Sequence, residues 1–184
     1  MRKPPPTTPR WLIIAEKELG VREIEGPRHE GRILEYLKTA LNLGNWGRGR
    51  DETAWCAAFV NWCLEQAGYD GTKHALARSF IDWGYVVDGE PFGAVAVLRY
   101  SRNRDASTGS RGGFHVGFFI KEGKYSWRIL GGNQSNSVSY RNFPKKYYQL
   151  VALRYPYSLD LSPSTKPPSD PTDKLVCEDD SRTS

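Results

Sequence analysis

The stretch DETAWCAAFVNWCLEQAG, residues 51–68, contains two of the three cysteines in a chain of 184 residues. Its apolar residues recur at spacings of three and four, which places them on one stripe of a helix. We predict a helix over residues 54–67, preceded by the favourable N-cap residues Asp51 and Thr53. The apolar stripe consists of Cys56, Phe59, Val60, Cys63, Leu64 and Ala67.

The two cysteines of this helix are expected to differ in their chemistry. Cys56 falls in the first turn, where unpaired backbone N–H groups and the positive end of the helix dipole favour a thiolate. Cys63 lies in the middle of the apolar stripe and is expected to be a buried, inert side chain. Seven helical residues separate their Cα atoms by about 10 Å, more than the roughly 7 Å that a disulfide spans. Cys56 is therefore the candidate nucleophile, although a core cysteine at a helix start fits the same pattern.

Further helices are expected before and after this segment, and strands follow them. Helical spacing recurs from Trp11 to Leu19 and stops at Gly20. A second helix is expected over 30–43 and a short helical piece over 75–84. Helices followed by strands predict an α+β fold, with N-terminal helices packed on a five-stranded, mainly antiparallel sheet. The five strands are expected where β-branched and aromatic residues gather, at 94–100, 114–120, 126–132, 137–143 and 150–156.

The length of the chain favours a single domain with two tails. We expect a flexible proline-containing lead over residues 1–8, a folded domain over 9–157, and a disordered acidic tail rich in Ser, Thr and Pro over 158–184. Cys177 lies in this tail and is expected to be an incidental thiol. The apolar runs are far shorter than a membrane span, so no membrane insertion is expected.

The charge of the chain is unevenly distributed. The net charge is +5, but residues 159–184 contain three basic and six acidic residues, which leaves +8 for residues 1–158. A basic domain favours polyanionic partners, and nucleic acid and anionic wall polymers fit the charge equally well. Because no DNA- or RNA-binding motif accompanies the charge, nucleic acid is not the expected partner.

The first twenty residues do not predict export, because the apolar run WLIIA is followed at once by EKE. We therefore expect synthesis in the cytoplasm without a signal peptide. An extracellular target would then be reached after lysis, holin release or dedicated secretion. A metal site is not expected either, since the three histidines lack metal-ligand spacing and no C-x-x-C motif is present. No cofactor is predicted.

A catalytic cysteine needs a base, and His115 is the best placed of the three histidines. His29 and His74 stand in polar segments before helices, where they are expected to be solvated or capping residues. His115 begins a strand after the glycine-rich loop SRNRDASTGSRGG, and such loops often border functional sites. Asn133, at the end of the next strand, could accept the ring N–H of His115. Alternatively, His115 is a structural residue of its strand, and Asn133 is a turn residue.

The order of these residues resembles the CHAP-like family of cysteine, histidine-dependent amidohydrolases and peptidases, in the NlpC/P60 papain-like group. The similarity covers about residues 10–156 and rests on four motifs in order. They read DETAWCAAFVNWCLEQAG at 51–68, ARSFIDWG at 77–84, HVGFF at 115–119 and LGGNQSNSVS at 130–139.

The resemblance implies a papain-like α+β fold with Cys56 as nucleophile, His115 as general base and Asn133 as the residue that orients it. Trp55 and Gln134, which flank two of these positions, are expected to line the substrate cleft. The implied activity is hydrolysis of an amide bond in peptidoglycan, either the N-acetylmuramoyl-L-alanine bond or a bond within the peptides. Peptidoglycan and anionic wall polymers are the expected partners. The alternative is a non-catalytic wall-binding module with a degenerate CHAP fold.

Overall fold

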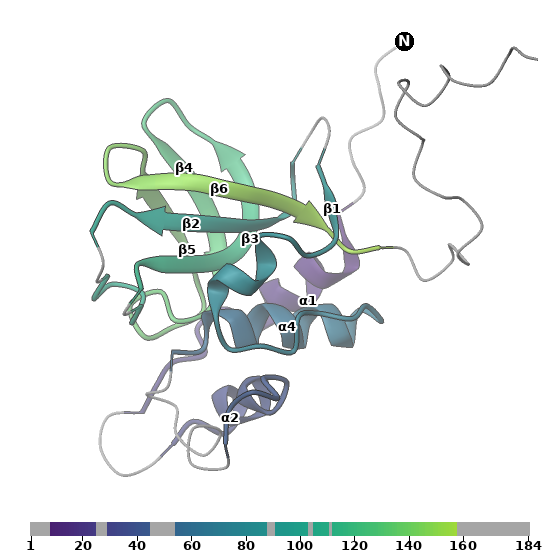
Figure 1. Cartoon of the computed structure of the whole chain (residues 1–184). Helices are drawn as coiled ribbons and strands as arrows, with labels where there is room; N and C mark the ends of the chain where they lie inside the picture. Colours follow the sequence, from purple (N-terminus) through teal and green to yellow (C-terminus); the bar gives the residue numbers. More distant parts are fainter. Residues whose placement is uncertain are drawn as a thin grey trace, which may run out of the picture.

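The computed structural model describes residues 8–24, 29–44, 54–87, 91–102, 105–110 and 112–157. Within these ranges, α-helices precede one antiparallel sheet of six strands in the order β1-β6-β2-β3-β4-β5 (Figure 1). The helices are α1 (Arg10–Lys17), α2 (Gly31–Lys38) and α4 (Cys56–Gln66), with a 3₁₀ turn, η1 (Ala77–Phe80), before the strands. The strands are β1 (Tyr85–Val86), β2 (Val95–Tyr100), β3 (Phe114–Glu122), β4 (Ser126–Gly131), β5 (Ser139–Pro144) and β6 (Tyr148–Tyr155).

The predicted α+β class and the antiparallel sheet are confirmed, but the expected number of five strands is wrong. The additional strand, β1, has two residues and pairs with the end of β6. Its sequence is too short for an alternating pattern, and pairing with the edge of β6 is what defines it. The helix predicted over 30–43 ends earlier, at Lys38, and the piece at 75–84 contains only the four residues of η1. The predicted lead and tail lie outside the described residues, except for Thr8.

Helix α4 is the centre of the helical layer. It contacts α1, α2, β3 and β4, and Figure 1 shows it between the sheet and α2. Its side chains from Cys56 to Val60 are all buried, as are Cys63 and Leu64. This burial explains why the segment is so apolar, since an amphipathic stripe suffices only for a helix with one face in water. None of the described helices is long and apolar enough to cross a membrane.

The start of α4 differs from the prediction. The helix begins at Cys56 with Trp55 at the N-cap position, and no side chain accepts a capping hydrogen bond there. The predicted caps Asp51 and Thr53 lie outside the described residues. The expectation that Cys56 stands in the first turn is nevertheless confirmed. Cys56 and Cys63 are both buried. Both are free thiols, because their spacing along the helix is too long for a disulfide between them.

The sheet has an apolar core on each face, because alternate residues of a strand point to opposite sides. Val95 and Val97 of β2 join the core beneath the helices. Ala96 and Leu98 join a second, smaller core that includes Phe143 and Tyr148. The sheet therefore buries aromatic side chains on the face away from α4 as well.

A close contact joins the end of β4 to the start of α4. A Cβ atom placed on Gly132 would lie 2.7 Å from Cε3 of Trp55 and 2.8 Å from Cβ of Phe59. The chain that follows α1 adds support, because Glu23 N donates to Asn136 O at 2.9 Å and Val138 N donates to Val21 O at 2.8 Å. Only a residue without a side chain fits between the sheet and α4 at position 132.

We predict that Gly132→Ala lowers the free energy of unfolding by about 1–3 kcal/mol, because the added methyl overpacks two buried rings. Gly31→Ala is the matched control, since a Cβ there meets no atom within 4 Å and alanine favours the helix. Urea denaturation of the two variants measures the difference. Equal stability of Gly132→Ala and the wild type would show that this contact does not hold α4 in place.

Candidate active site

The thiol of Cys56 lies at the junction of α4 and β3. The side chain is 4% exposed, and the backbone N–H groups of Val116, Ala57 and Cys56 itself lie close enough to its sulfur to lower the pKa of the thiol. Val116 follows His115 directly on β3, so the thiol lies near the backbone of the strand that carries the predicted base. Burial raises the pKa of the thiol to about 11, although the three N–H groups act in the opposite direction.

His115 is buried as well, with an exposed fraction of 1%. Its ring stacks on Phe143 at 5.2 Å between centroids. Its Nε2 atom lies 3.1 Å from Oε1 of Gln134. Its Nδ1 atom has no hydrogen-bond partner, and among the described residues it is the only buried side-chain nitrogen or oxygen without one. Such an atom is costly in a folded protein unless it has a function or binds a ligand.

The hydrogen bonds of Gln134 fix the tautomer of His115. The amide nitrogen of Gln134 donates to the backbone carbonyl of Ser139, and a carbonyl oxygen can only accept. The other end of the amide, which faces His115, is therefore the oxygen, so Nε2 of His115 must carry the proton. Nδ1 is left with a lone pair in the neutral ring. The lone pair of a neutral imidazole is what a general base requires.

Asn133 does not make the predicted hydrogen bond to His115. It is buried, with a backbone φ of 56°, and its amide nitrogen would lie 3.1 Å from a Cβ added to Gly109. The left-handed conformation turns the chain sharply after Gly132, so Gln134 rather than Asn133 points at the imidazole. Gln134 thus occupies the position that we assigned to Asn133, and a catalytic role of Asn133 stays a prediction.

The two residues expected to line the cleft are instead buried. Trp55 is 0% exposed, packs on Tyr36 and Phe59, and donates from Nε1 to Oε1 of Glu23 at 2.8 Å. Gln134 is 1% exposed and engages His115. Neither side chain lines an open surface in this structure. An aromatic residue beside a nucleophile in the sequence does not distinguish a cleft wall from a core residue, and here Trp55 is a core residue.

Gly131, the last residue of β4, explains another feature of the site. A Cβ atom on Gly131 would lie 3.2 Å from Oε1 of Gln134 and 3.3 Å from Nε2 of His115. A larger residue would separate the two hydrogen-bonding atoms. Glycine at 131 is thus a condition for the pairing of Gln134 with His115.

The prediction did not include Asp105, a buried carboxylate in the loop between β2 and β3. It is 4% exposed and accepts hydrogen bonds from Ser107, from Oγ1 of Thr108 at 2.9 Å and from Oη of Tyr148 at 2.9 Å. Burial alone would raise the pKa of Asp105, but these hydrogen bonds outweigh burial and lower it. Its negative charge raises the pKa of both Cys56 and His115. The only signal in the sequence is an Asp followed by Ser and Thr two and three residues on, which is an ordinary turn pattern.

The pKa of His115 is about 4, lowered mainly by burial, even though Gln134 and Asp105 both raise it. Together with the raised pKa of Cys56, this gives a pair that is neutral at pH 7 when the site is closed and dry. A neutral resting pair still allows a proton to pass from sulfur to nitrogen when a substrate is attacked. The initial expectation of a thiolate at the helix start is therefore wrong for this state, because desolvation outweighs the helix N–H groups.

The other two histidines lie apart from this pair in the fold. Nδ1 of His74 accepts the backbone N–H of Leu76 at 3.1 Å, so this ring closes a local turn after α4. His29 lies just before α2. In the described part of the chain, no three His, Cys, Asp or Glu residues are grouped so that they could hold a metal ion.

Comparisons with known proteins give no assignment. No protein-family model matches the chain, and neither the curated proteins nor the solved structures contain a match.

We predict that His115 makes the protein less stable in mild acid. The unfolded chain takes up a proton at this ring near pH 6.5, but the folded protein does so only near pH 4. The free energy of unfolding should therefore fall as the pH drops from 6.5 to 4, by about 3 kcal/mol in total at roughly 1.4 kcal/mol per pKa unit. Denaturation at several pH values, with His115→Gln as the comparison, measures this contribution. An unchanged slope in His115→Gln between pH 6.5 and 4 would contradict it.

Proposed function

We propose that this protein is a cysteine-dependent hydrolase with a papain-like fold that cleaves an amide bond in peptidoglycan. The observation that carries the proposal is the unpartnered Nδ1 atom of His115, the residue directly before Val116, whose backbone N–H lies near the thiol of Cys56. A buried base with a free lone pair and a thiol at a helix N-terminus are the two groups that acyl transfer needs. The resemblance of the four motifs to CHAP-like enzymes supplies the substrate class.

In the proposed mechanism, Cys56 passes its proton to Nδ1 of His115 as the sulfur attacks the amide carbonyl carbon. Gln134 acts as the positioning residue, since its oxygen holds Nε2–H and keeps Nδ1 as the accepting atom. The buried charge of Asp105 favours the imidazolium that forms. The backbone N–H of Cys56, at the start of α4, is a donor for the oxyanion of the tetrahedral intermediate.

The remaining steps return the site to its starting state. The imidazolium gives its proton to the departing amine as the C–N bond breaks, which leaves a thioester on Cys56. His115 then takes a proton from water, the resulting hydroxide attacks the thioester, and the thiol leaves with that proton. The products are an amine and a carboxylic acid.

The substrate bond is the N-acetylmuramoyl-L-alanine bond or one within the peptides. The basic charge of residues 1–158 fits an anionic wall. Synthesis in the cytoplasm followed by lysis, holin release or dedicated secretion is part of the same proposal.

The burial of Cys56 favours a second candidate, a non-catalytic wall-binding module with the same fold. A thiol that is 4% exposed, with a pKa of about 11, is far less reactive than an exposed thiolate. A binding module would keep its affinity for peptidoglycan after treatment with iodoacetamide and would release no amine. A hydrolase would lose activity on alkylation of Cys56.

We predict that Cys56→Ala and Cys56→Ser abolish the release of new amino groups from purified peptidoglycan while the fold is retained. Cys63→Ala is the matched control, because this second buried thiol lies two turns further along the same helix. It should cost on the order of 1 kcal/mol in stability and leave activity largely unchanged. Mass spectrometry of the released fragments identifies the bond. Full activity in both Cys56 variants would eliminate the proposal.

We also predict that Gln134→Ala lowers kcat about 10-fold to 100-fold, because the imidazole loses its fixed tautomer and orientation. Asn133→Gly removes the neighbouring amide and tolerates the positive φ at that position, so it should have a smaller effect on kcat. Gln134→Glu should partly restore activity and raise the pKa of the base in the pH–rate profile, since a carboxylate also accepts from Nε2–H. A larger loss of kcat in Asn133→Gly than in Gln134→Ala would assign the orienting role to Asn133.

A further inference from the structure

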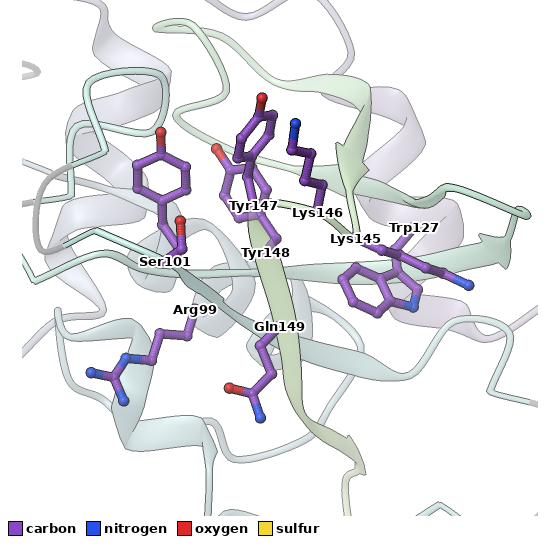
Figure 2. A pocket seen from close by; sticks show the side chains of 9 residues that line it. Arg99, Ser101, Trp127, Lys145, Lys146, Tyr147, Tyr148 and Gln149 are labelled. Carbon is purple, nitrogen blue, oxygen red and sulfur yellow. The ribbon is translucent and has the colours of Figure 1, made fainter.

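A second site candidate lies at the end of β2 and the turn between β5 and β6. It is a cavity of about 450 Å³, within the range of about 300–1,000 Å³ typical of small-ligand sites. Figure 2 shows that its walls come from separate strands, with Arg99 and Trp127 on opposite sides and Tyr147, Tyr148 and Lys146 between them. None of these residues belongs to the site of Cys56 and His115.

The cavity is positively charged. Arg99, Lys145 and Lys146 line it, and Lys145 pairs with the carboxylate of Glu122. Among the described residues, no carboxylate forms an ion pair with Arg99 or Lys146. Two cations without an acidic partner favour an anionic group in the ligand.

The cavity is also lined by aromatic rings. Trp127, Tyr100, Tyr147 and Tyr148 contribute to its walls, and Tyr147 is 44% exposed. The electron-rich faces of such rings pack well against the C–H groups of a sugar ring. Ser101 and Gln149 add a hydroxyl and an amide at the cavity, which can hydrogen-bond to sugar hydroxyls.

The aromatic wall is physically connected to the candidate active site. The ring of Tyr148 lies 4.9 Å from that of Tyr100 and 4.9 Å from that of Phe143, and Phe143 stacks on His115 at 5.2 Å. The hydroxyl of Tyr148 also donates to Asp105 at 2.9 Å. The aromatic wall of the cavity is thus held at a fixed position relative to His115.

We propose that this cavity binds an anionic sugar, a pyranose unit carrying a carboxylate or a phosphate, as an anchoring subsite for a glycan polymer. Aromatic faces hold the ring, while Arg99 and Lys146 hold the charge. The inference deepens the proposed function, since it gives the hydrolase a place to hold a wall polymer, but binding itself requires no catalysis.

The test is isothermal titration calorimetry on the full chain carrying Cys56→Ala, which prevents turnover. The probes are galacturonate oligomers, sugar-phosphate oligomers, neutral dextran oligomers, polyphosphate and oligo(dT), at matched length and salt. We expect at least one charged sugar to bind about tenfold more tightly than neutral dextran oligomers, polyphosphate or oligo(dT), a difference of about 1.4 kcal/mol. Which of the two charged sugars binds better identifies the anionic group.

Substitutions locate the binding site. Arg99→Glu and Lys146→Glu, each made alone, should weaken binding of the charged sugar about tenfold or more, and Tyr147→Ala should weaken it without a change in charge. Lys38→Glu is the matched charge control, because Lys38 ends α2 on the helical side of the molecule. It should leave the affinity nearly unchanged.

The inference is overturned if polyphosphate, dextran or oligo(dT) binds as tightly as the charged sugars. It is equally overturned if neither charged sugar binds, or if Lys38→Glu weakens binding as much as the substitutions in the cavity. Amine release by the protein with Cys56 intact is measured separately. Sugar binding without amine release would refute only the hydrolase, and amine release without sugar binding would refute only this subsite.

Discussion

The close approach of Gly132 to Trp55 and Phe59 is the constraint on which the site depends. It lets the end of β4 rest directly on the first turn of α4. The sulfur of Cys56 then meets the N–H of Val116, and Gln134, two residues beyond Gly132, meets His115. Three elements far apart in the sequence supply the thiol, the imidazole and the amide. A side chain at position 132 would push these elements apart.

The same close packing makes the site dry, and this has a chemical consequence. Burial raises the pKa of Cys56 and lowers the pKa of His115, so the resting pair is neutral. The backbone N–H groups near the sulfur lower the pKa of Cys56, and Gln134 and Asp105 raise the pKa of His115, but burial outweighs these effects at both residues. In the proposed hydrolase, the thiol would stay protonated until a substrate carbonyl lies against the sulfur. This arrangement also protects a free thiol from oxidation.

Much of the fold could be predicted from the sequence, because its signals are local. The apolar stripe from Cys56 to Ala67 follows from periodicity, and the five longer strands follow from clusters of β-branched and aromatic residues. The short strand β1 could not be predicted, because its pairing with β6 is a tertiary contact. The helix was predicted to begin near Thr53 but begins at Cys56. Local capping preference does not determine where a buried helix begins.

The site was predictable to the level of residue positions but not of individual contacts. Cys56 lies near the backbone of β3 at Val116, the residue after His115, and the pairing of its thiol with the imidazole stays a prediction. The choice between Asn133 and Gln134 depends on a left-handed turn that adjacent residues in the sequence do not specify. Asp105 and its hydroxyl partners come from a loop whose pattern is that of any turn. Burial, which sets the protonation of the pair, is a property of the whole fold.

The most direct test of this account is the tautomer of His115. Long-range ¹H–¹⁵N spectra of histidine-labelled protein at pH 7, with the signal assigned by its loss in His115→Gln, report the protonation of each ring nitrogen. We predict that the imidazole of His115 is neutral, with the proton on Nε2, a free lone pair on Nδ1 and a pKa well below the ordinary 6.5. A proton on Nδ1, or an imidazolium at pH 7, would contradict it.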